Sequence, residues 1–467
     1  MSDQKFRLTS KHTRNFGGMA LLGVILLILG YVMSIVDLPG NHAADHHAAT
    51  VEHSDDHAVE PTGHEHGEAT GHGSHAEADQ SGHMEDGTWL RAVVHPKQIH
   101  GVHHHTEVSG MTKFGASFLG ASFWWLAVSL FGVFFIAVGY LANVGWYVML
   151  KRVLENYYRF LPFVGGILLL VFIIFGKDIY MWKAVEEGTD ALIDGKRALL
   201  NGVFFIASVV LLVSVWSLLA HMIKKASHAE EAQGGLENHK KSIKFSAIFM
   251  PTFGLGFSAA SFLWLMSVDP HWFSTIYAVY CFAGLFVGGM TVTMFITTHL
   301  RDKGHLPNLH GDHLHDMGKF MFAFSIFWAY IWVSQYLLIW YANIPEETVY
   351  YFQRMENYQL LFALNVVLNF VYPFIAMMPR KAKREAASLR SVGRVILLGR
   401  LVDVYLLIAP GVLGAEGGFA TLVMMAGAFL VLGGGFLFVV FKGFEDAPLE
   451  AKNHPYFGES IHHETGV

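Results

Sequence analysis

The sequence predicts an all-α, polytopic membrane protein with about ten transmembrane helices. Hydrophobic residues make up 53% of the 467 residues, charged residues make up 15%, and the mean hydropathy is +0.38. Soluble globular domains carry roughly 25% charged residues, so this composition favours a chain that lies in lipid. Apolar runs of about 20 residues, the length that crosses a hydrocarbon core, recur along the chain.

The apolar runs give the expected helices in order. We expect transmembrane helices near residues 16–36, 116–142, 158–176, 199–221, 245–268, 273–299, 318–341, 358–378, 393–412 and 418–442. The first run follows four basic residues and could be taken for a signal peptide. It has span length, however, and the Asp37-Leu-Pro-Gly40 that follows offers no small-residue cleavage site, so we expect an uncleaved first helix.

The distribution of Lys and Arg predicts the orientation. Basic residues gather in the N-terminal tail and in the even-numbered connections, whereas the odd-numbered connections are poorer in them and partly acidic. The basic set is Lys5, Arg7, Lys11, Arg14, Lys151, Arg152, Arg159, Lys224, Lys225, Lys240, Lys241, Lys244, Arg301, Lys303, Lys319, Arg380, Lys381, Lys383, Arg384, Arg390 and Arg394. Because cytoplasmic loops are enriched in Lys and Arg, we expect both termini on the cytoplasmic side.

Four regions follow from this reading. Residues 1–36 form a cytoplasmic tail and the first helix, and residues 37–110 form an external insert. The insert holds 15 of the 28 His and almost no large apolar residues, so we expect it to be largely disordered. Residues 111–445 form the multi-helix membrane domain, and residues 446–467 form a cytoplasmic tail.

The residues exclude most redox centres within the chain. Cys281 is the one cysteine, so an internal disulfide and a cysteine-ligated iron–sulfur cluster are excluded. The expected spans contain essentially no mid-membrane His for a haem. We therefore expect no covalently bound cofactor, and any electron transfer would need a diffusible quinone or a partner subunit.

Arg400 and Asp403 are the clearest ionisable pair within an expected span. They lie three residues apart and so share one helix face, with Tyr405 close by. Charged residues within a membrane are costly and are often functional. One interpretation is a proton-relay element that is reached from the cytoplasm; the other is an ion pair that neutralises itself and fixes helix packing.

A second candidate site is the turn Asp269-Pro-His-Trp-Phe273 at the external face. Asp269, His271 and Trp272 would supply a carboxylate, an imidazole and an indole, which suit a quinol hydroxyl and ring. The turn would then form part of a quinone site or an external proton site. The alternative is structural, with Asp269 capping the next helix and Trp272 anchoring at the interface.

Weaker candidates complete the expected proton path. Gln335 in the seventh span and His299 at the cytoplasmic end of the sixth could extend it. Asn365 and Asn369 share a face of the eighth span, and interhelical hydrogen bonding or a polar path would each explain them. The His and Asp residues of the sixth connection match no closed coordination pattern, so the sequence assigns no metal site.

Three motifs occur in order within residues 110–445. They are Ser267-Val-Asp-Pro-His-Trp-Phe-Ser-Thr-Ile-Tyr277, Gly311-Asp-His-Leu-His-Asp-Met-Gly-Lys319 and Ser334-Gln-Tyr-Leu-Leu-Ile-Trp-Tyr341. This pattern resembles the second quinone-binding-type membrane subunit of bacterial alternative complex III, a quinol:cytochrome c (or quinol:oxidase) oxidoreductase. That subunit belongs to the polysulfide reductase membrane-anchor (NrfD-like) family.

The resemblance implies a core of two four-helix bundles plus two further helices, in a bacterial inner membrane. It implies a homologous membrane subunit, an iron–sulfur subunit and c-type cytochrome subunits as partners, with haem and clusters on those partners and menaquinone or a similar quinone as ligand. The subunit would contribute to quinol binding, proton translocation or assembly without being an enzyme alone. A proton-coupled secondary transporter and a purely structural scaffold are the competing hypotheses.

Overall fold

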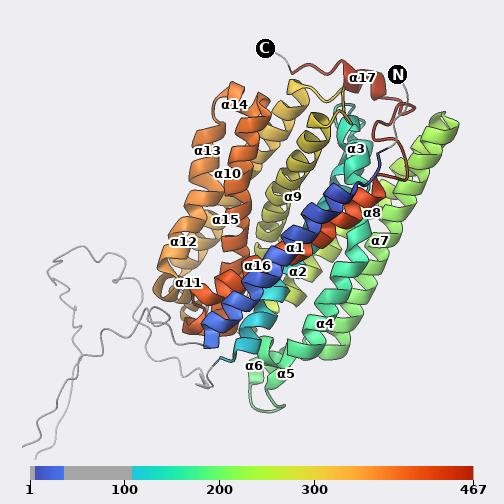
Figure 1. The fold of residues 1–467 in the computed structure, drawn as a ribbon. Coiled ribbons are helices and arrows are strands. Elements are labelled where there is room, and N and C mark those ends of the chain that lie inside the picture. Colours follow the sequence, from blue (N-terminus) through green and yellow to red (C-terminus); the bar gives the residue numbers. More distant parts are fainter. Residues whose placement is uncertain (1–5, 36–107, 466–467) are drawn as a thin grey trace, which may run out of the picture. The chain divides into compact units, whose positions relative to one another are not determined.

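Every regular element in the part of the chain that the structure describes is helical. The computed structural model describes residues 6–35 and 108–465, which belong to one compact unit. Ten helices in these ranges are long and apolar enough to cross a membrane, which confirms the predicted all-α polytopic fold. The expectation for the His-rich insert falls almost entirely on residues 36–107, outside the described ranges (Figure 1).

The ten candidate spans are built from these elements. They are α1 (Ser10–Ile35), α2 (Gly110–Ala142), α3 with η1 and α4 (Val148–Leu154, Tyr157–Phe160, Leu161–Ile179), α7 (Gly202–Gln233), α8 with η2 and η3 (Leu236–Ala260, Ser261–Leu265, Met266–Val268), α9 (Tyr277–Asp302), α10 (Gly311–Ala342), α12 with η4 and α13 (Gln359–Val366, Val367–Val371, Tyr372–Met377), α15 with η5 (Ala386–Leu413, Gly414–Glu416) and α16 (Phe419–Gly443). Five shorter helices lie between or after them: α5 (Met181–Ala184), α6 (Ala191–Lys196), α11 (Pro345–Asn357), α14 (Arg380–Arg384) and α17 (Phe457–Ile461).

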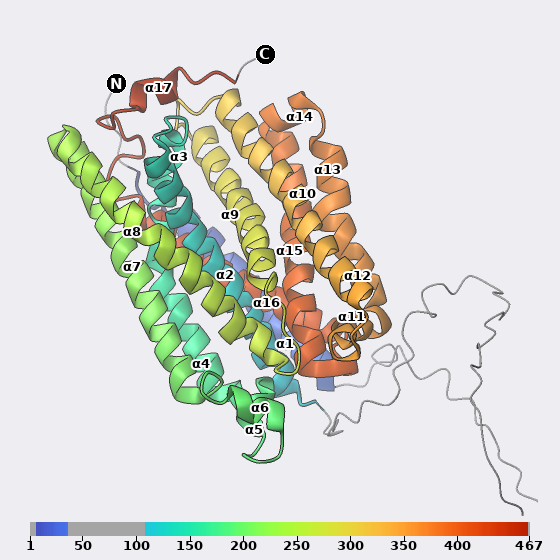
Figure 2. The ribbon, with the colours of Figure 1, turned by 180° about the vertical axis from the view of Figure 1, so that it is seen from behind.

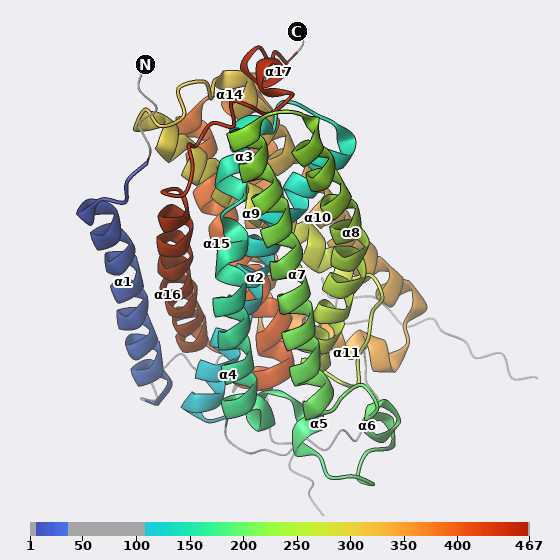
Figure 3. The same cartoon turned by 90° about the vertical axis from the view of Figure 1, so that its right-hand side faces the viewer.

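The spans form two four-helix bundles and a separate pair. The first bundle contains α2, α4, α7 and α8, and the second contains α9, α10, α12–α13 and α15. Helix α2 also packs against α9 and α15 and so joins the bundles (Figure 2). Helix α1 lies along α16, which in turn packs on α2 (Figure 3). The two bundles plus two helices that the family resemblance implied are therefore present.

The two ends of the bundle differ in what connects the helices. We call the end that carries the described chain ends, α3, α14 and α17 the terminal end, and the end that carries α5, α6 and α11 the opposite end (Figure 1). The terminal end receives the basic connections, including the run at Arg380–Arg384. At the opposite end, the turn 269–276 and α11 come together.

The expected fourth connection is wrong in its boundaries. Residues 222–244 were expected to be a basic loop, but α7 continues to Gln233 and α8 begins at Leu236. Gly234 and Gly235 make the turn with φ angles of 65° and 78°, which glycine adopts at little steric cost. Hydropathy marks only the apolar part of each helix, whereas the hydrogen-bonded helices continue through the polar residues that follow.

Helix α11 was not expected from hydropathy, because it is polar on average and too short to span. Pro345 occupies its first turn with Glu346 and Glu347, which are favourable at a helix N-terminus. Its inward face buries Tyr350, Tyr351 and Arg354 over the second bundle. A start signal of Pro followed by acidic residues, together with this aromatic face, is the sequence pattern that could have revealed it.

Residues 444–465, which we call the C-terminal segment, cross the terminal end. The Glu445 carboxylate accepts a hydrogen bond from the backbone N–H of Leu8 at 2.8 Å. The Asn453 amide donates to the carbonyl of Glu231 at 2.6 Å, and His463 Nε2 lies 2.6 Å from Asp316 Oδ2. The C-terminal segment thus connects α7, α10 and the residues that precede α1.

Glycines set the close approach of α1 to α16. A Cβ atom on Gly23 would lie 2.6 Å from the carbonyl oxygen of Gly427, and one on Gly427 would lie 2.6 Å from that of Gly23. Gly30 is equally close to α16, with Met424 Cγ 2.6 Å from its ideal Cβ. Small residues at this spacing let transmembrane backbones approach closely. Such packing drives helix association in lipid, where the hydrophobic effect does not.

We predict opposite outcomes for two alanine substitutions in α1. Gly23→Ala would push Cβ into the α16 backbone and should lower the apparent Tm, because overpacking costs about 1–3 kcal/mol. Gly18→Ala has no atom within 4 Å of its Cβ and should leave the Tm unchanged or slightly raised through helix propensity. Thermal unfolding of the detergent-purified protein checks both, and equal Tm values would rule out a packed α1–α16 contact.

Candidate functional site

The Arg400–Asp403 pair lies buried in the second bundle. Arg400 Nη1 donates to Asp403 Oδ2 at 3.1 Å, and the two side chains are 1% and 4% exposed. Asp403 is ten residues before the end of α15 at Leu413 and 17 after its start at Ala386. At a rise of roughly 1.5 Å per residue, it therefore lies nearer the opposite end than the terminal end.

Two asparagines close a hydrogen-bonded ring around this pair. The Arg400 Nε donates to Asn369 Oδ1 at 2.7 Å, Asn369 Nδ2 donates to Asn365 Oδ1 at 2.6 Å, and Asn365 Nδ2 donates to Asp403 Oδ1 at 3.0 Å. Asn369 lies in the π-helical turn η4, a widened turn that is frequent at functional sites. The expected interhelical hydrogen bonding by the Asn pair is therefore present, and it serves the ion pair.

Helices α9 and α10 complete the enclosure. The Tyr280 hydroxyl donates to Asp403 Oδ1, and the Arg400 guanidinium lies over the Trp328 ring at 4.8 Å. Gly284 leaves the space for the guanidinium, since a Cβ there would lie 2.8 Å from Arg400 Nη1. We call these residues the ion-pair cluster: Tyr280, Trp328, Asn365, Asn369, Arg400 and Asp403. Its residues come from four spans: α9, α10, α12 with η4, and α15.

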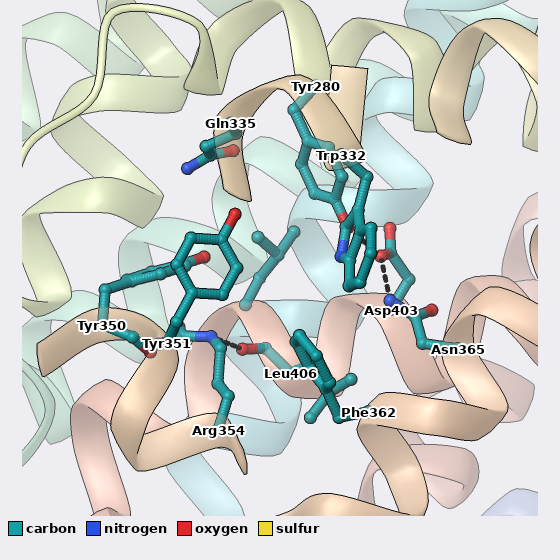
Figure 4. Close-up of a pocket in the computed structure, with 11 residues that line it drawn as sticks. Tyr280, Trp332, Gln335, Tyr350, Tyr351, Arg354, Phe362, Asn365, Asp403 and Leu406 are labelled. Atoms are coloured by element: carbon teal, nitrogen blue, oxygen red, sulfur yellow. Dashed lines mark hydrogen bonds between the residues drawn. The ribbon is translucent and has the colours of Figure 1, made fainter. Parts of the chain in front are cut away.

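A pocket borders the cluster on the side of α11. It has about 310 Å³ of empty space, including its open mouth, at the small end of the range for ligand sites. Its walls come from α9, α10, α11, α12 and α15, and Figure 4 shows the lining side chains around one space. The lining residues are Tyr280, Trp332, Gln335, Tyr350, Tyr351, Arg354, Phe362, Asn365, Asp403, Leu406 and Leu407. We call it the cluster pocket.

Two polar side chains stand out in the cluster pocket. The Gln335 side chain is 4% exposed, and its Nε2 has no hydrogen-bond partner among the described residues. Arg354 donates from Nε to the Leu406 carbonyl at 3.0 Å and from Nη1 to the Tyr350 carbonyl at 2.6 Å. Buried donors are normally hydrogen-bonded, so this one suits a ligand that brings an acceptor. The pocket would thus bind a molecule with a polar group and an aromatic or apolar body.

A smaller pocket of about 200 Å³ adjoins the first one. It contains Asp269 and Trp272 of the predicted external turn and shares Tyr350, Arg354 and Leu407 with the cluster pocket. The Trp272 and Tyr350 rings stack at 3.8 Å and 13°, and the Arg354 guanidinium lies 3.3 Å from the Tyr350 ring centroid. The two sites that the sequence put at separate depths therefore meet through α11.

His271 separates from Asp269 and Trp272. Its side chain is exposed, and Nε2 lies 2.6 Å from Asp190 Oδ2 near the start of α6. The Lys196 ammonium donates to the Pro270 carbonyl at 2.6 Å and further secures the turn. The structural alternative for Asp269 is not observed, because α9 starts after Ile276 without a side-chain cap.

The two carboxyl groups near this turn, Asp269 and Asp190, have pKa values shifted in opposite directions. Burial raises the pKa of Asp269, and the positive charge of Arg354 offsets part of that effect. The hydrogen bond from His271 lowers the pKa of Asp190. Asp269 is therefore the carboxyl that is more easily protonated, which suits a group that takes up and releases protons.

Tyr405 and His299 lie apart from the ion-pair cluster. The Tyr405 hydroxyl donates to the Gly418 carbonyl at 3.2 Å, so it secures the α15–α16 turn. His299 lies at the terminal end, where its ring is 5.9 Å from that of His12 and 6.2 Å from that of Phe441. Neither residue has a described contact with Asp403, so their role in a proton path stays a prediction. Gln335, in contrast, lines the cluster pocket.

Sequence reasoning missed Arg354, Tyr280 and Asp190. Arg354 was passed over because hydropathy placed it in a connection, although it follows Tyr350 and Tyr351 on one helix face. Tyr280 is one aromatic among many in its span, and nothing in the sequence marks it. Asp190 was counted as one of several loop acids, and its pairing with His271 depends on a contact between residues 81 positions apart.

No protein-family model and no curated protein matches this chain. The family resemblance therefore rests on the three motifs and their order.

We predict that breaking the buried pair on one side is worse than removing both charges. Asp403→Asn leaves the Arg400 charge uncompensated and should cost about 3–5 kcal/mol. The double variant Arg400→Met with Asp403→Leu should regain much of that loss. Chemical unfolding in detergent measures both, with Tyr405→Phe on the same helix as a control that costs about 1 kcal/mol. A double variant that is no more stable than Asp403→Asn would contradict a direct pair.

We predict a pH-dependent gain from Asp269→Asn. Because the folded protein raises the pKa of this carboxyl, its contribution to stability is complete below the unfolded pKa and is lost as pH rises through the folded pKa. The variant should therefore have a higher Tm than the unsubstituted protein at pH 7, and the two should converge near pH 4. Asp190→Asn should do the reverse and lower the Tm at pH 7, since the pKa of Asp190 is lowered. A pH-independent difference for Asp269→Asn would contradict this assignment.

Proposed function

We propose that this chain is a membrane subunit of a respiratory quinol-oxidising complex and that the cluster pocket binds the quinol head group. One observation carries the proposal: aromatic walls, an unpartnered amide donor and a buried, hydrogen-bonded carboxylate converge on one space. A quinol needs an apolar slot for its ring and polar groups for its two hydroxyls. The family resemblance points to the same ligand class.

The pocket walls suit a flat ring. Trp332 from α10, Tyr351 from α11 and Phe362 from α12 border the space, with the Trp332 and Phe362 ring centroids 5.0 Å apart. Gln335 Nε2 would donate to one quinone oxygen, and its carbonyl would accept from the corresponding quinol hydroxyl. A quinol held here would have its second hydroxyl directed at Asp403.

Proton transfer would start at Asp403. Its carboxylate accepts hydrogen bonds from Tyr280, Asn365 and Arg400, which hold it against the pocket. A general base must lie within hydrogen-bond reach of the proton that it takes. The proton would then pass beside Arg354 to Asp269, whose raised pKa suits release at the opposite end.

Electrons would leave through other subunits. The proposal includes a homologous membrane subunit, an iron–sulfur subunit and c-type cytochrome subunits that carry the clusters and haems. It places the complex in a bacterial inner membrane with both termini on the cytoplasmic side, which the basic residues of the terminal end support. The opposite end, with α11 and Asp269, would then be external.

The transporter hypothesis loses one of its supports. The segment Ala409-Pro-Gly-Val-Leu-Gly414 has the Gly and Pro residues expected of a broken helix, yet α15 continues through Pro410 to Leu413. Transporter sites are typically built from discontinuous helices whose ends point at the substrate.

We predict that Gln335→Leu raises the KM for quinol about threefold to tenfold, the effect of losing one neutral hydrogen bond. Stability should change little, because Gln335 Nε2 has no partner to lose among the described residues. Quinol oxidation by the complex isolated from native membranes gives the KM. The matched control is Tyr330→Phe. Tyr330 lies on the same helix and is 65% exposed, so this variant should leave KM unchanged.

Isolation from the native membrane tests the complex itself. Co-purification of haem-containing and iron–sulfur subunits with the chain supports the proposal. A lone oligomer that exchanges a substrate across vesicles would contradict it, as would a photoreactive quinone that labels peptides outside α9–α12 and α15.

A further inference from the structure

A second buried polar region lies at the terminal end, outside the ion-pair cluster. Lys151 Nζ lies 3.1 Å from Glu230 Oε2, and Arg152 contacts Glu155 at 2.9 Å and Glu231 at 3.4 Å. Lys151, Arg152, Glu155 and Glu230 are at most 3% exposed. Hydropathy had placed the basic residues in an exposed connection, but the C-terminal segment and the α7–α8 hairpin cover them.

Three potential ligands meet beside these charges. Glu230 comes from α7, His239 from α8 and His454 from the C-terminal segment, and one ligand atom of each lies within 4.8 Å of the others. His239 Nδ1 is 2.9 Å from Glu230 Oε1. The ligand atoms of a tetrahedral zinc site lie roughly 3.3 Å apart, so small side-chain shifts would admit an ion.

Three buried polar atoms around this group have no partner among the described residues. They are His454 Nε2 and the hydroxyls of Tyr140 and Tyr147. The Tyr140 ring centroid lies 5.3 Å from that of His239 and 5.9 Å from that of His454, and the Tyr147 ring lies 6.3 Å from His454. Native proteins leave few such atoms unsatisfied, and three at one place indicate a group that they enclose.

We propose that Glu230, His239 and His454 bind a divalent cation of the Zn²⁺ class, with a water or a tyrosine hydroxyl as fourth ligand. Carboxylate and imidazole are ordinary zinc ligands. Lys151 occupies Glu230 Oε2, which leaves Oε1 as a single ligand atom on the side of His239. The ion fixes the C-terminal segment to the α7–α8 hairpin.

The surrounding charges admit a cation. Lys151 and Arg152 stand against three carboxylates, those of Glu155, Glu230 and Glu231. A histidine ligand must be a neutral imidazole, and His454 would bind through Nε2, its unpartnered ring atom. Binding through Nε2 moves the ring proton to Nδ1 and removes the acceptor of the Tyr456 backbone N–H, one neutral hydrogen bond at 3.2 Å.

Zinc retention by the full-length protein tests the site. The purified chain is loaded with Zn²⁺ and passed through gel filtration with a moderate chelator, which strips weakly bound ions from the His-rich insert. We expect one retained equivalent in the unsubstituted protein, none in His454→Gln and one in His463→Gln. His463 is the matched control, because it lies on the same segment and pairs with Asp316 instead.

Two outcomes of the retention experiment would overturn the proposal. One is that the unsubstituted protein retains no zinc. The other is that the unsubstituted protein, His454→Gln and His463→Gln retain zinc equally. X-ray absorption of the retained zinc in the unsubstituted protein does not depend on how the variants fold. Two imidazoles with oxygen ligands in a four-coordinate shell support the site, and a shell of three or more imidazoles assigns the ion to the insert.

Discussion

The buried ion pair between Arg400 and Asp403 is the constraint on which the second bundle depends. A charge inside a membrane is costly unless it is paired and its remaining hydrogen-bonding atoms are satisfied. The pair obtains partners from α9 through Tyr280 and from the α12–η4 segment through Asn365 and Asn369, and Arg400 Nη2 is left without a partner among the described residues. Helix register in this bundle is therefore set by polar geometry as well as by apolar packing. The same geometry leaves the Asp403 carboxyl group facing a pocket.

Helix α11 turns this buried pair into an accessible site. It lies across the opposite end of the second bundle and brings Tyr350 and Arg354 between Asp403 and Asp269. The Trp272 ring on one side and the Arg354 guanidinium on the other enclose the Tyr350 ring. A short amphipathic helix thus connects two acidic residues, Asp403 on the span α15 and Asp269 in the turn before α9. Any occupant of either pocket would contact α11.

The terminal end is organised by a different principle. Its charges are buried by protein rather than by lipid, because α7 and α8 continue past the apolar segments and the C-terminal segment covers them. Lys151, Arg152, Glu155 and Glu230 then pair among themselves. This end stabilises the chain through ionic contacts, whereas the α1–α16 contact relies on the direct approach of glycine backbones.

The sequence by itself determined the helical class, the number of spans and the identity of the buried pair. Each of these depends on local quantities: the length of an apolar run, the spacing of Arg400 and Asp403, and the cost of a charge in lipid. It also named Asp269, Trp272 and Gln335, since polar groups beside apolar runs are conspicuous. The tertiary structure alone decided which of these meet. Four residues gain their partners from segments far away in the chain, and no local sequence pattern predicts such contacts. They are Arg354, Tyr280, Asp190 and His454. His271 and Tyr405 have the right chemistry, but packing directs them to Asp190 and Gly418. Hydropathy reports where a helix contacts lipid, and only the packed bundle decides which side chains share an interior.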